Sequence, residues 1–98
     1  MHARVATFEG ADFERAREEG QRRLDRGQTP PGMKGYLYLG DPEGRRSLFI
    51  TFFDNREDIQ AVEAEFERMG DEIPEDVRGR RTSVTYYEIL GSEVPALV

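Results

Sequence analysis

SLFITFFDNREDIQAVEAEFERM, the stretch from Ser47 to Met69, decides the fold that this sequence predicts. Its first seven residues are apolar on both sides of an extended strand, because successive side chains of a strand point to opposite faces of a sheet. A polar break follows, and apolar side chains then recur at helical spacing, at Ile59, Val62, Phe66 and Met69. The chain's own helices can cover one face of the strand. A chain of 98 residues needs another cover for the second face, and a second copy of the protein is the simplest one.

A strand and a helix are predicted before this stretch. Residues 3–9 alternate weakly between polar and apolar and indicate a strand. Asp12 is a good N-cap for the helix that follows, and Gly27 is a good C-cap. The inner stripe of this helix includes Gly20, whose missing side chain we expect to allow close packing on the sheet.

Two more strands complete the prediction. Residues 33–39 form a strand in which Tyr36 and Tyr38 point one way and the leucines between them point the other. The turn at residues 40–44 then joins this strand to residues 47–53 in an antiparallel hairpin. Residues 82–90 are rich in β-branched and aromatic side chains and form the last strand.

The order strand, helix, strand, strand, helix, strand predicts an α+β, ferredoxin-like βαββαβ fold. Its four-stranded antiparallel sheet carries both helices on one face. We expect a single domain over residues 1–90 and a short C-terminal tail over residues 91–98, which either packs on a partner subunit or frays. The open face carries either Leu48, Ile50 and Phe52 or Phe49, Thr51 and Phe53. Either set forms an apolar patch that indicates a homodimer.

The composition excludes several classes of protein. The net charge of −6 argues against a general nucleic-acid binder, which shows a basic stripe. The absence of cysteine excludes disulfides and thiolate metal sites. No stretch approaches the roughly 20 apolar residues that span a bilayer, and the N-terminus lacks the apolar core of a signal peptide. We therefore expect a cytoplasmic protein with no membrane partner.

No assembled set of catalytic or metal-binding residues stands out. His2 is the only histidine and has no partners at ligand spacing, and Asn55 is more simply a helix cap. Arg4 and Glu88 form either an anion clamp and base or a cross-strand salt bridge. Two small basic clusters, Arg45-Arg46 and Arg78-Gly79-Arg80-Arg81, could hold a phosphate or could simply be solvated turn residues.

Tyrosines are the best polar candidates for a pocket. Same-face tyrosines on adjacent strands, among Tyr36, Tyr38, Tyr86 and Tyr87, could orient a phenolic or quinone ligand by hydrogen bonds and ring stacking. The competing interpretation is ordinary strand packing, with each hydroxyl group reaching solvent.

Four local features of the chain stand out together: the opening segment 2–10, the start of the second strand at 32–36, the strand-to-helix junction at 52–57, and the closing strand at 83–89. In these features the chain resembles the dimeric α/β-barrel superfamily, in its antibiotic-biosynthesis-monooxygenase-like (ABM-like) branch. The resemblance spans nearly the whole chain and concerns architecture more than chemistry.

The resemblance implies a barrel made of two subunits, with a pocket between the sheet and helices of each. Some members oxygenate polyketide-type phenols without metal or flavin, and others degrade haem. These enzymes often use an Asn, a Trp and, for haem, a His. This chain has no Trp, Phe53 stands where the Trp is common, and its only Asn and His are Asn55 and His2, which argues against haem degradation.

Two functions from different classes stay open. The first is a cofactor-independent monooxygenase that acts on a small aromatic or quinone-like compound. The second is a non-catalytic small-molecule-binding or stress-associated dimer. The tentative pocket, with no metal and no cofactor, consists of Arg4, Tyr36, Tyr38, Phe53 and Tyr86.

An RNA-recognition motif shares the βαββαβ order, and residues 46–52 loosely resemble its third-strand aromatic motif. The glycine of that motif is missing, the first strand offers only Phe8, and the chain is acidic. We therefore predict no nucleic-acid partner.

Overall fold

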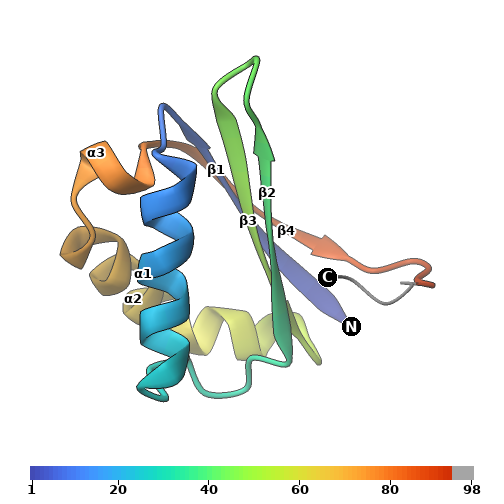
Figure 1. Cartoon of the computed structure of the whole chain (residues 1–98). Helices are drawn as coiled ribbons and strands as arrows, with labels where there is room; N and C mark the ends of the chain where they lie inside the picture. Colours follow the sequence, from blue (N-terminus) through green and yellow to red (C-terminus); the bar gives the residue numbers. More distant parts are fainter. Residues whose placement is uncertain (94–98) are drawn as a thin grey trace.

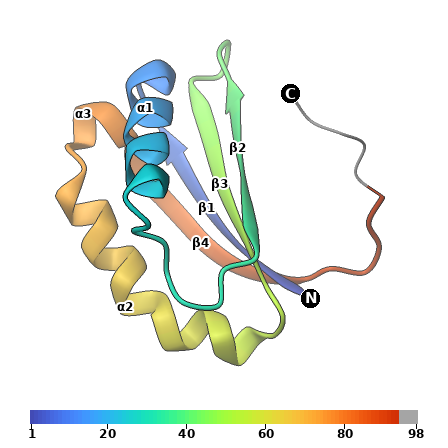
Figure 2. The same cartoon turned by 60° about the horizontal axis from the view of Figure 1, so that its bottom comes forward.

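The computed structural model describes residues 1–93 and confirms the ferredoxin-like α+β fold (Figure 1). The elements are β1 (His2–Glu9), α1 (Phe13–Asp25), β2 (Gly35–Asp41), β3 (Arg46–Phe53), α2 (Arg56–Glu72), α3 (Glu75–Arg78) and β4 (Arg80–Glu88). The sheet order is β2-β3-β1-β4, and every neighbouring pair is antiparallel. The three helices lie on one side of the sheet (Figures 1 and 2).

The register decides which residues face the helices. Arg4 of β1 lies opposite Thr51 of β3 and Tyr86 of β4, and Thr51 lies opposite Tyr36 of β2. Arg4 is hydrogen-bonded to Glu63 of α2, so this row faces the helices. Because side chains alternate along a strand, every second residue counted from this row along each strand also faces the helices.

Of the two residue sets predicted for the open face, it is therefore Leu48, Ile50 and Phe52 that lie there. Their cross-strand neighbours on β2 include Leu37 and Leu39, and the Leu39 side chain is 45% exposed. Phe49, Thr51 and Phe53 point to the helices instead. The predicted orientation of Tyr36 and Tyr38, opposite to the leucines, is confirmed.

Side-chain caps fix where the two long helices begin. The Asp12 carboxylate accepts the backbone N–H of Arg15 at the start of α1. The Asn55 amide oxygen accepts the backbone N–H of Asp58 at the start of α2 (2.9 Å). Both residues satisfy backbone donors that lack a partner inside the helix. Asn55 is thus the helix cap, as its position in the sequence indicates.

The core lies between α2 and the sheet. Phe53, Ile59, Val62 and Phe66 form its buried cluster, and the rings of Phe53 and Phe66 meet edge to face at 6.1 Å. Helix α1, by contrast, has no buried residue. The expected close packing at Gly20 is wrong, because a side chain placed there would meet no atom within 4 Å. Helix α1 thus stands away from the sheet at Gly20, whereas Phe13 at its start packs against Gly40 of β2.

The observed element ends either match the predicted ones, as at Glu9 and Phe53, or differ from them by up to three residues. The last strand begins earlier than predicted because a bulge between Thr7 and Phe8 shifts its pairing with β1. Residues 94–98 of the predicted tail lie outside the described residues. Within residues 1–93, no helix is both long enough and apolar enough to cross a membrane.

Candidate functional site

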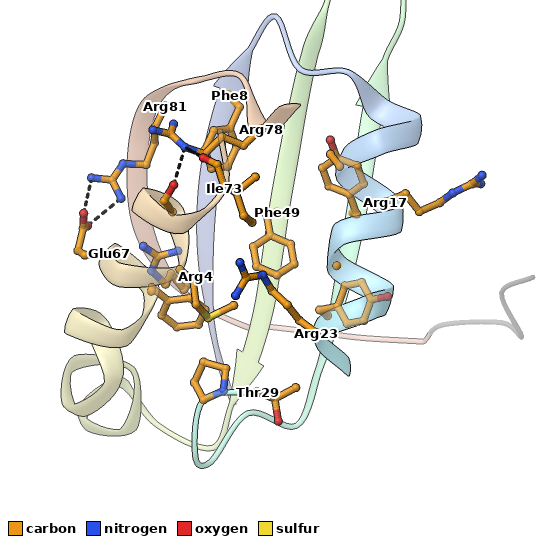
Figure 3. A pocket seen from close by; sticks show the side chains of 18 of the residues that line it. Arg4, Phe8, Arg17, Arg23, Thr29, Phe49, Glu67, Ile73, Arg78 and Arg81 are labelled. Carbon is orange, nitrogen blue, oxygen red and sulfur yellow. Dashed lines mark hydrogen bonds and ion pairs between the residues drawn. The ribbon is translucent and has the colours of Figure 1, made fainter. Parts of the chain in front are cut away.

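A cavity of about 1000 Å³ lies between α1 and the helix-facing side of the sheet (Figure 3). Its volume matches the upper range of small-molecule sites. The sheet contributes aromatic and basic side chains, α1 contributes Ala16, Gly20 and Leu24, and α2 closes the opposite wall with Phe66 and Met69. The gap under Gly20 is thus part of a site large enough for a ligand with several rings.

Aromatic rings form the sheet wall of this cavity. Tyr36 and Phe49 lie 5.9 Å apart between ring centroids at a tilt of 54°, and Tyr38 pairs with Phe49 across the β2–β3 ladder. The Tyr38 hydroxyl is buried and has no hydrogen-bond partner among residues 1–93. Burial raises the pKa of Tyr38 and outweighs the opposite effect of the Ser47 side chain, so this group stays a neutral hydroxyl.

A buried ion pair stands at the centre of the sheet. The Arg4 side chain is only 3% exposed, and its Nε and Nη2 donate to the Glu63 carboxylate at 2.7–3.1 Å. The Tyr86 hydroxyl donates to the same carboxylate at 2.6 Å. The guanidinium also lies 4.2 Å from the centroid of the Phe66 ring, within the range of a cation–π contact. Arg4 is therefore fixed in place where it lines the cavity.

The Arg4–Glu63 ion pair and the Tyr86 hydroxyl group change the pKa values of Glu63 and Tyr86. Burial by itself would raise the pKa of Glu63, but hydrogen bonds from Arg4 and Tyr86 outweigh burial and hold that pKa below its usual value. Burial, together with the bond to the Glu63 carboxylate, raises the pKa of Tyr86 to about 12. At neutral pH the group is a carboxylate, a guanidinium and a neutral phenol. Tyr86 is thus no base.

More arginines line the cavity from other elements. Arg23 of α1 reaches α2, where its Nη1 lies 3.0 Å from Glu72 Oε2. Arg78 donates from Nε and Nη1 to the backbone carbonyls of Gly70, Ile73 and Gly79, and so ties α3 to the end of α2. Each guanidinium is held by partners on the protein and adds positive charge to the wall.

Glu67 of α2 holds a further lining arginine, Arg81 of β4, with two hydrogen bonds (2.7 and 2.9 Å). The bulge in β1–β4 places Arg81 opposite Phe8, in register with the helix-facing side chains. All three arginines of the predicted cluster at residues 78–81 are thus bonded within the protein, since Arg80 pairs with Glu9.

The structure separates the five residues predicted for the pocket. Arg4, Tyr36 and Tyr38 line the cavity. Phe53 is fully buried in the core, and Tyr86 lies beside the core, bonded to Glu63. A ligand contact at any of the five stays a prediction.

The expected Arg4–Glu88 salt bridge is wrong. Glu88 lies opposite His2 in the register and is exposed, whereas Arg4 pairs with Glu63. Sequence reasoning could not choose between these carboxylates, because the contact between β1 and α2 spans 59 positions.

Sequence reasoning missed Arg23 and Phe49 as cavity residues. Arg23 stands beside Leu24 and three positions after Gly20, on the helical face that lines the cavity, so helical spacing could have identified it. Phe49 belonged to one of the two residue sets of β3 that could face the helices, and only the strand register shows which set does.

No metal site is evident among residues 1–93, where no group of three potential ligand side chains clusters. Haem is a prosthetic group that the resemblance to ABM-like proteins implies. The only histidine of the chain, His2, does not line the cavity, so the residues present do not fit a histidine-ligated haem.

The fold of this chain is similar to that of solved antibiotic-biosynthesis-monooxygenase structures. Among solved structures, a candidate antibiotic biosynthesis monooxygenase from Deinococcus radiodurans is similar over 100% of both chains, with a TM-score of 0.60 and 18% identity. A monooxygenase of Streptomyces coelicolor in complex with nanaomycin D is similar over 97% of this chain and 92% of its own, with a TM-score of 0.61 and 12% identity.

A variant of MhuD with two manganese protoporphyrin IX molecules bound per active site is a third similar structure. It covers 97% of this chain and 100% of its own, with a TM-score of 0.58 and 17% identity. No protein-family model and no curated protein matches the sequence. At these identities the likeness concerns the fold.

Proposed function

We propose that this protein binds a small aromatic phenol in the cavity between the sheet and α1 and oxygenates it without a cofactor. The observation that carries the proposal is the cavity itself, about 1000 Å³ with Tyr36, Tyr38 and Phe49 along one wall. A flat aromatic ligand can stack on these rings, and the Tyr38 hydroxyl makes no hydrogen bond of ordinary geometry among residues 1–93, with the Ser47 side chain as its polar neighbour. The similar structure that holds nanaomycin D supports the same ligand class.

The chemistry needs only the substrate and dioxygen. A phenol with a free para position loses its hydroxyl proton to solvent water, and the phenolate passes electrons from its para carbon to dioxygen. A carbon–oxygen bond forms there. The para C–H bond and the O–O bond then break, so one oxygen atom stays as the second carbonyl of a quinone and the other leaves as water. The substrate supplies every electron.

This chain's contribution to that reaction is binding and electrostatics. The fixed guanidinium groups in the wall favour the phenolate over the phenol, because opposite charge nearby favours the charged form. The tyrosine hydroxyls orient the substrate oxygen by donating to it. The apolar side chains of α1 and α2 exclude water from the reacting carbon.

The test is turnover of alpha-naphthol to para-naphthoquinone, followed by dioxygen uptake and by mass spectrometry with isotopically labelled dioxygen. We expect one labelled atom in each quinone. Tyr38→Phe should lower kcat/KM roughly fivefold to tenfold, the size expected for one lost hydrogen bond. Tyr87→Phe is the matched control, because Tyr87 is exposed on the opposite face of the sheet.

Two results would contradict an oxygenase. One is quinone formation no faster than in buffer across a series of naphthols and larger phenols. The other is equal loss of activity in Tyr38→Phe and Tyr87→Phe, since a reaction in this cavity should respond only to Tyr38.

A non-catalytic binding protein is the second candidate, and one observation favours it. No histidine, the side chain that most often serves as a general base, lines the cavity among residues 1–93. In that case the same phenols bind with measurable affinity and are recovered unchanged under dioxygen.

We also propose that the protein is a homodimer through its open sheet face. Leu37 and Leu39 of β2 and Leu48, Ile50 and Phe52 of β3 lie on that face, opposite the helices. Apolar patches of this kind mark interaction surfaces, and a second sheet packed face to face would cover this one.

A further inference from the structure

We propose that the ligand of this cavity carries a carboxylate on its aromatic frame and that Arg23 binds this carboxylate. The inference rests on the proposed function as far as the cavity is a ligand site. It is independent of whether the ligand is oxygenated.

Arg23 is the side chain that points to an anion. It leaves α1, reaches the edge of α2 and is held there by Glu72, and only 15% of the side chain is exposed. Its Nε is buried and has no hydrogen-bond partner within residues 1–93. A guanidinium has five N–H donors, no acceptor and a permanent charge, so a ligand that completes its bonding must offer an acceptor.

The surroundings of Arg23 favour a charged acceptor. Figure 3 shows its guanidinium directed toward the side of the cavity where Arg4 lies, near the ring of Phe49. Arg4 is also fixed, since Glu63 holds its Nε and Nη2. Glu72 orients the Arg23 guanidinium through Nη1 and leaves Nε without a partner among residues 1–93, so the fixed group still has a donor for a carboxylate.

The charge of the cavity wall as a whole also favours an anionic ligand. Six arginines line the cavity against three carboxylates, in a chain whose net charge is −6. The three carboxylates, those of Glu67, Asp71 and Glu75, come from α3 and the C-terminal half of α2. Glu67 is already paired with Arg81. The side next to Arg23 and the tyrosines therefore offers donors and aromatic faces.

Selectivity between two matched probes tests the proposal. Naphthoate and naphthamide share one frame and differ in charge, and calorimetry gives a dissociation constant for each. We expect the wild-type protein to bind naphthoate about tenfold or more tightly than naphthamide, with a preference that shrinks as salt is raised. Arg23→Gln should remove most of this preference. Arg23→Lys should retain part of it, because the charge stays and the planar fork is lost.

Arg22→Gln is the control variant. Arg22 directly precedes Arg23 in α1. Its side chain is 52% exposed and pairs with Glu19. It does not line the cavity. The substitution changes the net charge of the protein by the same amount, so a loss of preference in both variants would reflect general electrostatics and would overturn the assignment to Arg23.

The remaining outcomes of these binding measurements also test the proposal that Arg23 binds a carboxylate. Equal binding of both probes by the wild-type protein overturns the inference, whether or not any variant folds. Equal weakening of both probes in Arg23→Gln assigns Arg23 to the α1–α2 bridge alone and overturns it as well. Binding of neutral naphthol without preference for naphthoate leaves the proposed function standing, whereas failure of every aromatic probe removes both.

Discussion

Glu63→Gln should be among the most destabilising polar substitutions in the chain. Glu63 is the partner of the buried Arg4 and accepts the Tyr86 hydroxyl as well. The glutamine has the same shape but no charge, so the Arg4 guanidinium, which is 3% exposed, would be left without a counter-charge in the core. Loss of one partner of a buried pair costs about 3–5 kcal/mol.

The lower end of that range applies here. The Glu63 side chain is 29% exposed, so solvent screens part of its interaction with Arg4. We therefore expect the free energy of unfolding to fall by about 3 kcal/mol, which is a fall in Tm of roughly 12–24 °C for a domain of this size.

Glu67→Gln is the matched control. It is the same substitution one turn along the same helix, and Glu67 also accepts two hydrogen bonds from an arginine, Arg81. That pair is exposed, with 36% of the Arg81 side chain and 47% of the Glu67 side chain open to solvent. Its loss should cost less than about 1 kcal/mol. Urea unfolding followed by far-ultraviolet circular dichroism gives both values at neutral pH.

The pH dependence gives a second measurement of the same pair. Because the folded protein holds the pKa of Glu63 below the usual 4.5, the carboxylate stabilises the fold above pH 4.5. This stabilisation should be lost as the pH falls through the lowered pKa. The difference between wild-type protein and Glu63→Gln should therefore be constant near neutral pH and shrink below 4.5. Equal costs for the two glutamine variants would refute the reasoning from burial.

Four further outcomes are expected. Ultraviolet titration should show one tyrosine ionising near pH 12, and Glu63→Gln should lower the pKa of Tyr86, with an unchanged titration contradicting the hydrogen bond. Gly20→Ala should raise the free energy of unfolding by about 1 kcal/mol, because the new methyl group meets open space and alanine favours helix. Gly79→Ala should instead destabilise severely in the same urea assay, since φ is +84° and the methyl group would lie 2.6 Å from the Glu9 carbonyl oxygen. Ile50→Asp on the open face should convert the proposed dimer to monomers in sedimentation velocity, and a wild-type monomer would contradict the proposal.

The fold could be predicted because its signals are local. The apolar run of β3, the period of α2 and the caps at Asp12 and Asn55 all reside in short windows of sequence. The facing of β3 could not be predicted, since a shift of one residue in register exchanges the two faces of a strand. The contact from Arg4 to Glu63 fixes that facing, and it joins elements far apart in the chain.

The candidate site was less accessible to sequence reasoning for a related reason. A stripe with Gly20 and Leu24 predicts a helix packed on the sheet, and nothing in its spacing shows that the helix stands away from it. The cavity depends on the side chains of Phe49 and Tyr38 across the gap. Likewise, Tyr86 is indistinguishable from Tyr38 in an alternating strand, yet one is bonded to Glu63 and the other faces the cavity.

The central claim, that the cavity under α1 is the ligand site, is tested most directly by the affinity of alpha-naphthol for Gly20→Leu. A leucine side chain at this position projects into the cavity, where no atom lies within 4 Å of the first added carbon. Gln21→Leu is the control, because Gln21 is exposed on the same helix and does not line the cavity. By calorimetry, we expect Gly20→Leu to weaken binding at least tenfold and Gln21→Leu to leave it unchanged. Wild-type affinity in a folded Gly20→Leu variant would contradict the account.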